Sequence, residues 1–321
     1  MFRFGFIGDI LRWILDNVYH VIPNYGWAVI VFTLIMRLIL MPLDIKSKQS
    51  MKRMNDVKPQ LDAINKKYAK DKEKLNQKTQ ELYKKEKINP LAGCLPMLIQ
   101  LPFMFAMYAI MREVAGEQLV KLVLDIKTAL DSGVANYQPA FQSFFWIKNV
   151  FQPDSFMATV VPAFKDPLGA IGATALLSSD QLNAAKAFLA TDQYANWAAA
   201  FGNAPWYTST PIILFGSITI PWKINGLFIL PLVAAVSQYF STQLMTAGTP
   251  QQPAADGKPN TNQFMKYFFP LFSIWICATS NAGFALYWVS LNLIQLAQQF
   301  FINRWFKYKD AQNKLSKGEL T

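Results

Sequence analysis

An arginine inside an apolar stretch is the residue of this sequence with the clearest chemical consequence. Residues 26–44 are almost entirely apolar and long enough to cross a bilayer, yet they contain Arg37. A guanidinium stays charged in ordinary protein sites, and placing one in hydrocarbon costs at least about 2.5–3.5 kcal/mol. We therefore expect Arg37 to face other helices or a water-filled cavity. The alternative is a side chain that snorkels to the membrane surface near Asp44, seven residues further on.

Uncharged polar residues in the other apolar stretches are candidates to line the same space. Thr33 precedes Arg37 by one helical turn and therefore lies on the same face of that helix. Gln100, Gln243 and Asn292 each lie in a different apolar stretch. Amides at this depth also form ordinary hydrogen bonds between helices, so a purely structural role is the alternative for each of them.

The sequence offers little for catalysis or metal binding. Its single histidine, His20, has no cluster of acids or cysteines around it, and its two cysteines, Cys94 and Cys277, lie in apolar stretches without a pairing pattern. No Gly-rich phosphate loop and no Gly-x-Ser-x-Gly motif occurs. We expect no cofactor, no metal and no enzymatic activity, because the sequence contains no constellation of base, nucleophile or metal ligands.

Composition restricts the chain to one broad class. Of its 321 residues, 52% are hydrophobic and only 16% are charged, and the mean hydropathy is +0.16. A soluble protein carries about 25% charged residues, and apolar runs of bilayer length recur along this chain. These features predict an all-α polytopic membrane protein and exclude water-soluble fold classes. The formal net charge of +11 is concentrated in a few segments, where it favours anionic partners such as lipid head groups or RNA.

The apolar runs predict five transmembrane helices. They cover residues 24–44, 91–112, 224–245, 264–280 and 283–303. The other segments are an N-terminal interfacial amphipathic helix at 1–22, a cytoplasmic basic helical hairpin at 45–90, an extracytoplasmic segment with a helical insertion at 113–223, a cytoplasmic loop at 246–263 and a basic cytoplasmic tail at 304–321. The first helix is interrupted by charges and is followed by no cleavage pattern, so we do not interpret it as a signal peptide.

Residues 45–90 show the sharpest change in composition. They contain 14 Lys or Arg residues and six acids. Short basic segments stay in the cytoplasm, which places the N-terminus outside and the C-terminus inside. Heptad-like spacing on both sides of a polar break at 69–74 predicts two helices, with Pro59 in a first turn or at a kink. The hairpin suits an acidic partner or an RNA backbone, and a merely solvated basic loop is the alternative.

Four motifs resemble the YidC/Oxa/Alb family of membrane protein insertases. They are NYGW at 24–27 followed by RLILMPL at 37–43, KINPLAGCLPMLIQLP at 87–102, FWI at 145–147 before PD at 153–154, and AGFALYW at 282–288 with Asn292. Their order and spacing agree with the family over nearly the whole core. The motif at 87–102 is long and specific.

The resemblance implies a five-helix core around a hydrophilic groove, with an arginine of the first core helix inside it at the position of Arg37. It also implies that the third and fifth spans form the surface along which a client slides. Tyr287 and Trp288 lie on the fifth span, and packing or interface contacts are the alternative for both. The implied partners are nascent membrane protein clients, the ribosome and signal-recognition machinery, the Sec translocon and anionic lipids, in a bacterial cell membrane. No specific nucleic-acid sequence is implied.

The chain also departs from the family pattern. Residues 155–221 are longer than the external segment of the plainest members, and we expect neither the large extracytoplasmic domain of some members nor a lipoprotein-type signal. The short tail argues against strong ribosome tethering through the tail. Insertion without ATP hydrolysis, with Arg37 as a counter-charge, is the favoured function. The alternatives are a solute transporter or channel that uses Arg37 as an anion site, and an assembly factor that folds clients without inserting them.

Overall fold

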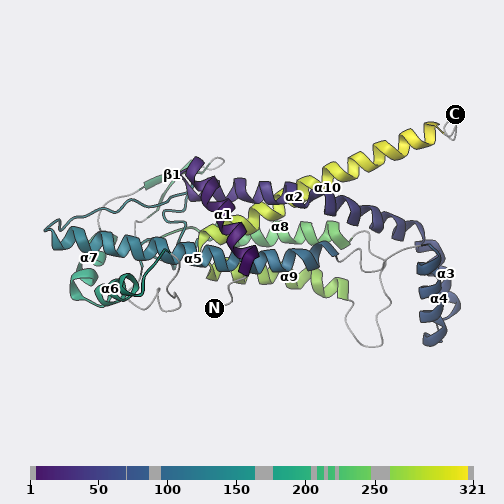
Figure 1. The fold of residues 1–321 in the computed structure, drawn as a ribbon, viewed down its shortest axis with the longest axis horizontal. Helices are drawn as coiled ribbons and strands as arrows, with labels where there is room; N and C mark the ends of the chain where they lie inside the picture. The colour runs from purple at the N-terminus through teal and green to yellow at the C-terminus, as the bar shows by residue number, and fades with distance from the viewer. Residues whose placement is uncertain are drawn as a thin grey trace. The chain divides into compact units, whose positions relative to one another are not determined.

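The computed structural model describes residues 5–69, 71–86, 95–162, 176–203, 208–212, 216–220, 224–246 and 261–316. In chain order the elements are α1 (Gly5–Val21), α2 (Tyr25–Asp56), α3 (Lys58–Lys67), α4 (Lys72–Lys85), α5 (Leu95–Asp131), α6 (Ser179–Leu189), α7 (Asp192–Asn203), β1 (Thr208–Ile212), β2 (Gly216–Ile220), α8 (Ile229–Thr246), α9 (Thr261–Thr279) and α10 (Ala282–Ser316) (Figure 1). The chain divides into two compact units, which are described separately below.

Most of the described part of the chain is helical, in agreement with the predicted class. Two short strands depart from that prediction. Strands β1 and β2 pair antiparallel, with Thr208 opposite Ile220 and Ile212 opposite Gly216. Among the described residues, α2 is the one helix with both the length and the hydropathy of a membrane span, and residues Phe264–Thr279 of α9 form a shorter apolar helix. The number of five spans stays a prediction.

Three helices continue well past the ends of the predicted spans. Helix α2 runs on to Asp56, α5 to Asp131 and α10 to Ser316. Falling hydropathy predicts where a helix leaves a membrane, but a helix ends only where its backbone pattern is broken. For α5 that break comes at Gly133, whose φ of 84° is accessible to glycine at little cost and whose N–H donates to the carbonyl of Leu130 at 3.0 Å.

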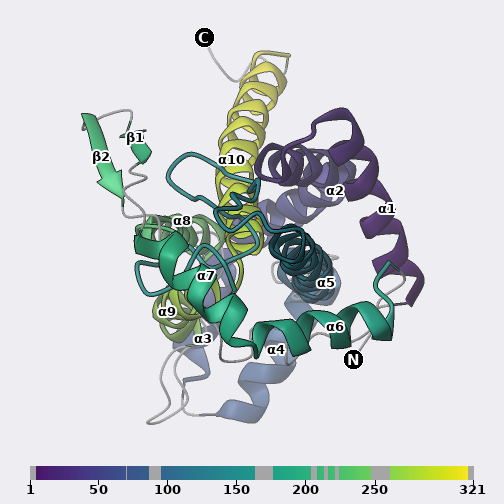
Figure 2. The same ribbon diagram turned by 90° about the vertical axis from the view of Figure 1, so that its left-hand side faces the viewer.

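The first unit comprises Met1–Thr33, Met104–Val236 and Leu271–Ser290. An apolar cluster in this unit joins the later turns of α5 to α6 and α7, which lie beside that helix in both views (Figures 1 and 2). Helix α6 begins at a reciprocal capping box, in which Ser178 and Gln181 each bond the other's backbone N–H. The buried members of the cluster are Leu119, Val120, Val123, Ile126, Val161, Leu177, Leu182, Ala185, Phe188, Leu189, Tyr194 and Trp197.

Helix α1 belongs to the same unit and is two-faced. Leu11 and Leu15 are buried, whereas Phe6 and Trp13 are largely exposed. An amphipathic helix with large exposed apolar side chains suits the surface of a membrane. The interfacial placement of this helix stays a prediction.

The second unit comprises Leu34–Phe103, Ser237–Pro270 and Leu291–Thr321. Helices α3 and α4 lie side by side in it (Figure 1), and Tyr83 packs on a small cluster of Met54 and Val57. Pro59 lies in the first turn of α3. Backbone N–H groups in a first turn have no acceptor within the helix, so proline, which has no N–H, is tolerated there. The second unit therefore contains a helical pair within the range predicted for the cytoplasmic hairpin.

Some predicted features lie outside the described residues. They are the start of the interfacial helix at 1–4, Lys70 in the hairpin and its end at 87–90, the start of the second span with Cys94 at 91–94, parts of the extracytoplasmic segment at 163–175, 204–207, 213–215 and 221–223, most of the loop at 247–260 and the last residues of the tail at 317–321.

Candidate functional site

Arg37 lies in the second unit and is almost fully buried, with 3% of its surface exposed. Its Nε donates a hydrogen bond to Oε1 of Gln298 on α10 at 2.9 Å, and Nε2 of Gln298 donates back to the carbonyl of Arg37 at 3.0 Å. One amide therefore holds both the side chain and the backbone of the arginine. This fixes the orientation of the guanidinium.

A buried carboxylate faces the same arginine. Nη2 of Arg37 lies 3.2 Å from Oδ2 of Asp44, which is 7% exposed. The two residues are seven positions apart on α2, and seven residues make almost two whole turns, so both side chains project from one face. Pro42 lies between them and cannot donate a backbone bond to Leu38, which loosens the helix at this point.

Three other predicted groove residues belong to the second unit. Asn292 is 3% exposed and donates from Nδ2 to Oγ of Ser237 at 3.2 Å. Gln243 donates from Nε2 to the hydroxyl of Tyr239 at 2.7 Å, and Gln100 is half-buried. The bond of Asn292 to Ser237 on α8 fits the structural alternative as well as a lining role.

The remaining predicted site residues belong to the first unit. Thr33 is fully buried and its hydroxyl donates to the carbonyl of Val29 at 2.6 Å. Tyr287 and Trp288 are also buried, and Nε1 of Trp288 donates to Oγ of Ser273 on α9 at 3.1 Å. Buried rings with a satisfied donor are typical of helix packing. A role of these two residues in sliding a client stays a prediction.

A second buried carboxylate, Asp154, organises the first unit. Its Oδ1 accepts from the backbone N–H of Leu227 at 2.9 Å and of Phe228 at 3.2 Å, and its Oδ2 accepts from the N–H of Leu230 at 2.7 Å. Nε1 of Trp146 donates to Oδ1 at 3.2 Å. A carboxylate at the start of α8 satisfies N–H groups that the helix itself leaves open, and the helix dipole favours its charge.

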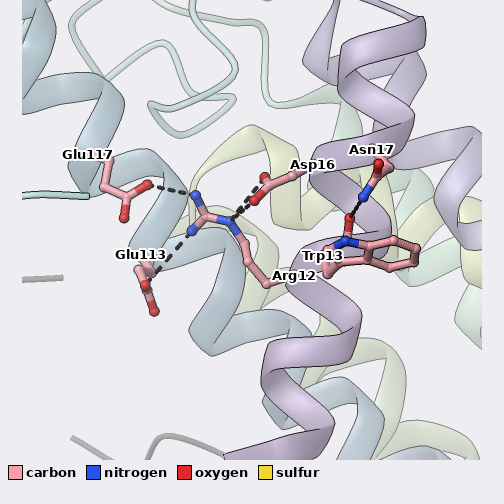
Figure 3. A network of polar contacts seen from close by, with 6 residues as sticks. All are labelled: Arg12, Trp13, Asp16, Asn17, Glu113 and Glu117. Atoms are coloured by element: carbon pink, nitrogen blue, oxygen red, sulfur yellow. Dashed lines mark hydrogen bonds and ion pairs between the residues drawn. The ribbon is translucent and has the colours of Figure 1, made fainter. Parts of the chain in front are cut away.

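Arg12 forms an ion-pair network between α1 and α5 (Figure 3). Nη2 of Arg12 lies 2.7 Å from Glu117, Nη1 lies 3.8 Å from Glu113, and Nε lies 2.8 Å from Asp16 one turn further along α1. Burial lowers the pKa of Arg12, but the hydrogen bonds and charges of Glu117 and Asp16 outweigh it and raise that pKa above its ordinary value. The network therefore joins α1 to α5 within the first unit.

Sequence reasoning found Arg37 but not its partners. Asp44 was recognisable, because the spacing of seven residues places it on the face of Arg37. Gln298 is 261 positions away in sequence, and only the packing of α10 identifies it among neighbouring amides. Within the described residues, no group of three or more His, Cys, Asp or Glu side chains is arranged to hold a metal ion.

These features together define the class of the protein. Large apolar side chains are exposed along several long helices, a pattern that soluble proteins rarely show over such an area. They include Leu34, Leu38 and Ile39 on α2, Leu232, Val236 and Phe240 on α8, and Leu293, Phe300 and Phe301 on α10. The chain is a helical membrane protein with a charged pair buried in a helix of spanning length.

Residues 17–311 match the family described as 60Kd inner membrane protein, and the chain belongs to that family. It is 28% identical over 312 residues to "Membrane protein insertase YidC" of Leptospira interrogans, a match that covers 97% of this chain and 35% of the relative. A protein of the same name from Fusobacterium nucleatum is 36% identical over 153 residues, 48% of this chain and 63% of the relative. This chain thus spans about a third of the length of the Leptospira relative.

Proposed function

We propose that this chain is a membrane protein insertase, which passes segments of nascent membrane proteins into the bilayer and helps them fold. The names of its relatives support this activity, and the family includes residues 17–311 of the chain. The proposal includes multiple spans, with the N-terminus outside and the C-terminus in the cytoplasm. The excess of basic residues at 45–90 and after 303 supports this orientation.

The burial of Arg37 in α2 carries the mechanistic part of the proposal. A permanently charged side chain that is 3% exposed in the apolar part of a helix is expensive to bury, and intramembrane charges of this kind usually have a function. In the proposed mechanism Arg37 lies in a hydrophilic groove with Thr33, Gln100, Gln243 and Asn292. It gives a transient counter-charge to an acidic segment that must cross the hydrocarbon layer.

The energetics require no nucleotide. Each Leu, Ile, Phe or Val at the centre of a client helix favours insertion by about 0.3–0.6 kcal/mol, whereas each uncompensated acid opposes it by about 2.5–3.5 kcal/mol. A groove that hydrates and pairs the acid removes most of that opposing free energy. The apolar segment then leaves the groove for lipid spontaneously. The acidic partner class for Arg37 follows from its charge.

A reconstitution experiment tests the counter-charge. The purified protein in liposomes is given a small single-span client whose translocated tail carries three acids, and insertion is measured by protection of the tail from protease. We expect Arg37→Ala to reduce insertion at least about tenfold, the factor given by about 1.4 kcal/mol, and Arg37→Lys to restore part of it.

The matched control is Arg53→Ala, which removes an exposed arginine from the same helix. It should leave insertion unchanged. Normal insertion of the acidic client by a folded Arg37→Ala protein would refute the counter-charge. Solute flux through the same liposomes without any client would instead favour the transporter or channel. The proposed partners are nascent clients, the ribosome and signal-recognition machinery, the Sec translocon and anionic lipids.

A further inference from the structure

The ion pair between Arg37 and Asp44 on α2 is the starting point for this inference. Both residues are buried, at 3% and 7% exposure, and Nη2 of Arg37 lies 3.2 Å from Oδ2 of Asp44. The positive charge that an acidic client would meet is therefore already balanced by a negative charge from the same helix. At low local dielectric such a neutral pair presents a far weaker field than an isolated guanidinium.

The contacts of the two residues are unequal. Gln298 holds Arg37 at Nε and at the backbone carbonyl, so the guanidinium keeps its place whether or not Asp44 is bound. Oδ2 of Asp44, in contrast, accepts no hydrogen bond from any described residue. Its contact with Arg37 is a charge contact that lacks the alignment of a hydrogen bond.

This arrangement suits an exchange of carboxylates. An incoming carboxylate with better alignment can replace Asp44 at the guanidinium without disturbing the bonds to Gln298. Asp44 competes as an intramolecular ligand, so a single client carboxylate faces a high effective concentration of its rival. Several acids in one client tail raise the local concentration on the client side and shift the exchange toward binding.

We propose that Asp44 is an internal competitor for Arg37 and sets how much negative charge a client tail needs for insertion. The proposal rests on the insertase function proposed above and names the residue that determines its selectivity. Asp44 is a specificity-determining residue in this scheme. Its removal lowers the charge threshold, whereas removal of Arg37 abolishes the preference for acidic tails.

The test uses three matched clients that carry zero, one or three acids in the translocated tail, in the liposome assay described above. With the unaltered chain we expect the three-acid client to insert well and the one-acid client to insert little better than the neutral client. Asp44→Asn should raise the ratio of one-acid to neutral insertion on the order of tenfold, the factor given by about 1.4 kcal/mol of removed competition. Asp56→Asn, an exposed acid at the end of the same helix, is the matched control and should leave the ratio unchanged.

Two results would overturn the competitor. One is full insertion of the one-acid client by the unaltered chain, which needs no variant and therefore decides the matter even if Asp44→Asn does not fold. The other is a folded Asp44→Asn protein that inserts all three clients less well and in unchanged proportion, which would make Asp44 a structural partner only. Failure of the insertase proposal itself looks different, because the unaltered chain would then insert none of the clients. Normal insertion of the three-acid client by a folded Arg37→Ala protein would instead refute the counter-charge, and with it the competitor.

Discussion

Two buried carboxylates, one in each unit, show opposite ways of keeping a negative charge inside this protein. Asp154 of the first unit is fully buried and accepts three backbone N–H bonds and one from Trp146. Asp44 of the second unit is 7% exposed, and its Oδ2 accepts no hydrogen bond from the described residues beside its charge contact with Arg37.

The difference in hydrogen bonding indicates a structural role for Asp154 and an exchangeable contact for Asp44. A carboxylate held by backbone N–H groups cannot leave without opening the loop that supplies them, so Asp154 fixes the start of α8. A carboxylate held by one side-chain charge can be replaced by another carboxylate, so Asp44 suits a site whose partner changes. The predictions below test the structural member of this comparison, from the largest expected effect to the smallest.

Asp154→Ala should give the largest loss of stability. It leaves the buried N–H of Leu230 and the partly buried N–H groups of Leu227 and Phe228 without their acceptor, and a buried unsatisfied group costs about 1–3 kcal/mol. We expect a total loss of about 3–5 kcal/mol, measured as a fall in the thermal unfolding midpoint of the protein in detergent.

Asp131→Ala is the matched control, because Asp131 is an exposed acid of α5 whose partner is the exposed Lys127. Exposed pairs of this kind contribute about 0–1 kcal/mol. Equal midpoints for the two variants would show that the hydrogen bonds of Asp154 contribute little. The contrast with Asp44 would then lose its basis.

Gly226→Ala should disturb the same carboxylate without removing it. A Cβ at position 226 would lie 2.0 Å from Oδ1 and 2.9 Å from Cα of Asp154, so the loop or the carboxylate must move. Overpacking of this kind costs about 1–3 kcal/mol. Gly283→Ala is the comparison, because a Cβ there comes no closer than 3.3 Å to Oδ1 of Asn281. If Gly226→Ala unfolded no earlier than Gly283→Ala, the site of Asp154 would be more adaptable than its bonds indicate.

Neither carboxylate was predicted from the sequence as the partner of another residue. Arg37 stood out because a charge in an apolar run is conspicuous, but Asp44 entered only as a marker of the membrane surface, although any helix places the two residues on one face. Asp154 was visible only as part of a family motif. Its bonds to Leu227 and Leu230 span more than 70 residues, and such long-range pairing has no periodic trace in the sequence.

The lack of a local sequence signal also explains what the fold prediction missed. Hydropathy located the long helices but not their ends, because α5 continues on helix-compatible residues to the turn at Gly133. The strands β1 and β2 were missed, although Thr208–Ile212 and Gly216–Ile220 are rich in the β-branched residues that favour strands. Local patterns therefore located the long helices, but they gave neither the partners of Arg37 nor those of Asp154.

The smallest expected effect is the pH dependence of stability that arises from Lys148. This residue extends the comparison of buried charges to a cation. It is 7% exposed and lies in the loop that also carries Asp154, and burial lowers its pKa from 10.5 to about 8. Between about pH 8 and 10.5 the unfolded chain binds more protons at this lysine than the folded chain does, so stability should rise with pH in that window. We expect a rise of about 1–2 kcal/mol, because the flexible side chain partly reaches water when it is charged. Thermal unfolding in detergent across this range measures it.

Lys148→Met should flatten that rise, and Lys121→Met, which removes an exposed lysine of α5, should not. A rise that persists in Lys148→Met would assign the pH dependence to another group. A flat profile in the unaltered chain would mean that Lys148 keeps its charge in the folded loop through a compensating interaction. In that case the loop would stabilise the charged form of Lys148 as well as that of Asp154. Stabilisation of buried charges would then be a property of the whole loop and not of the Asp154 site alone.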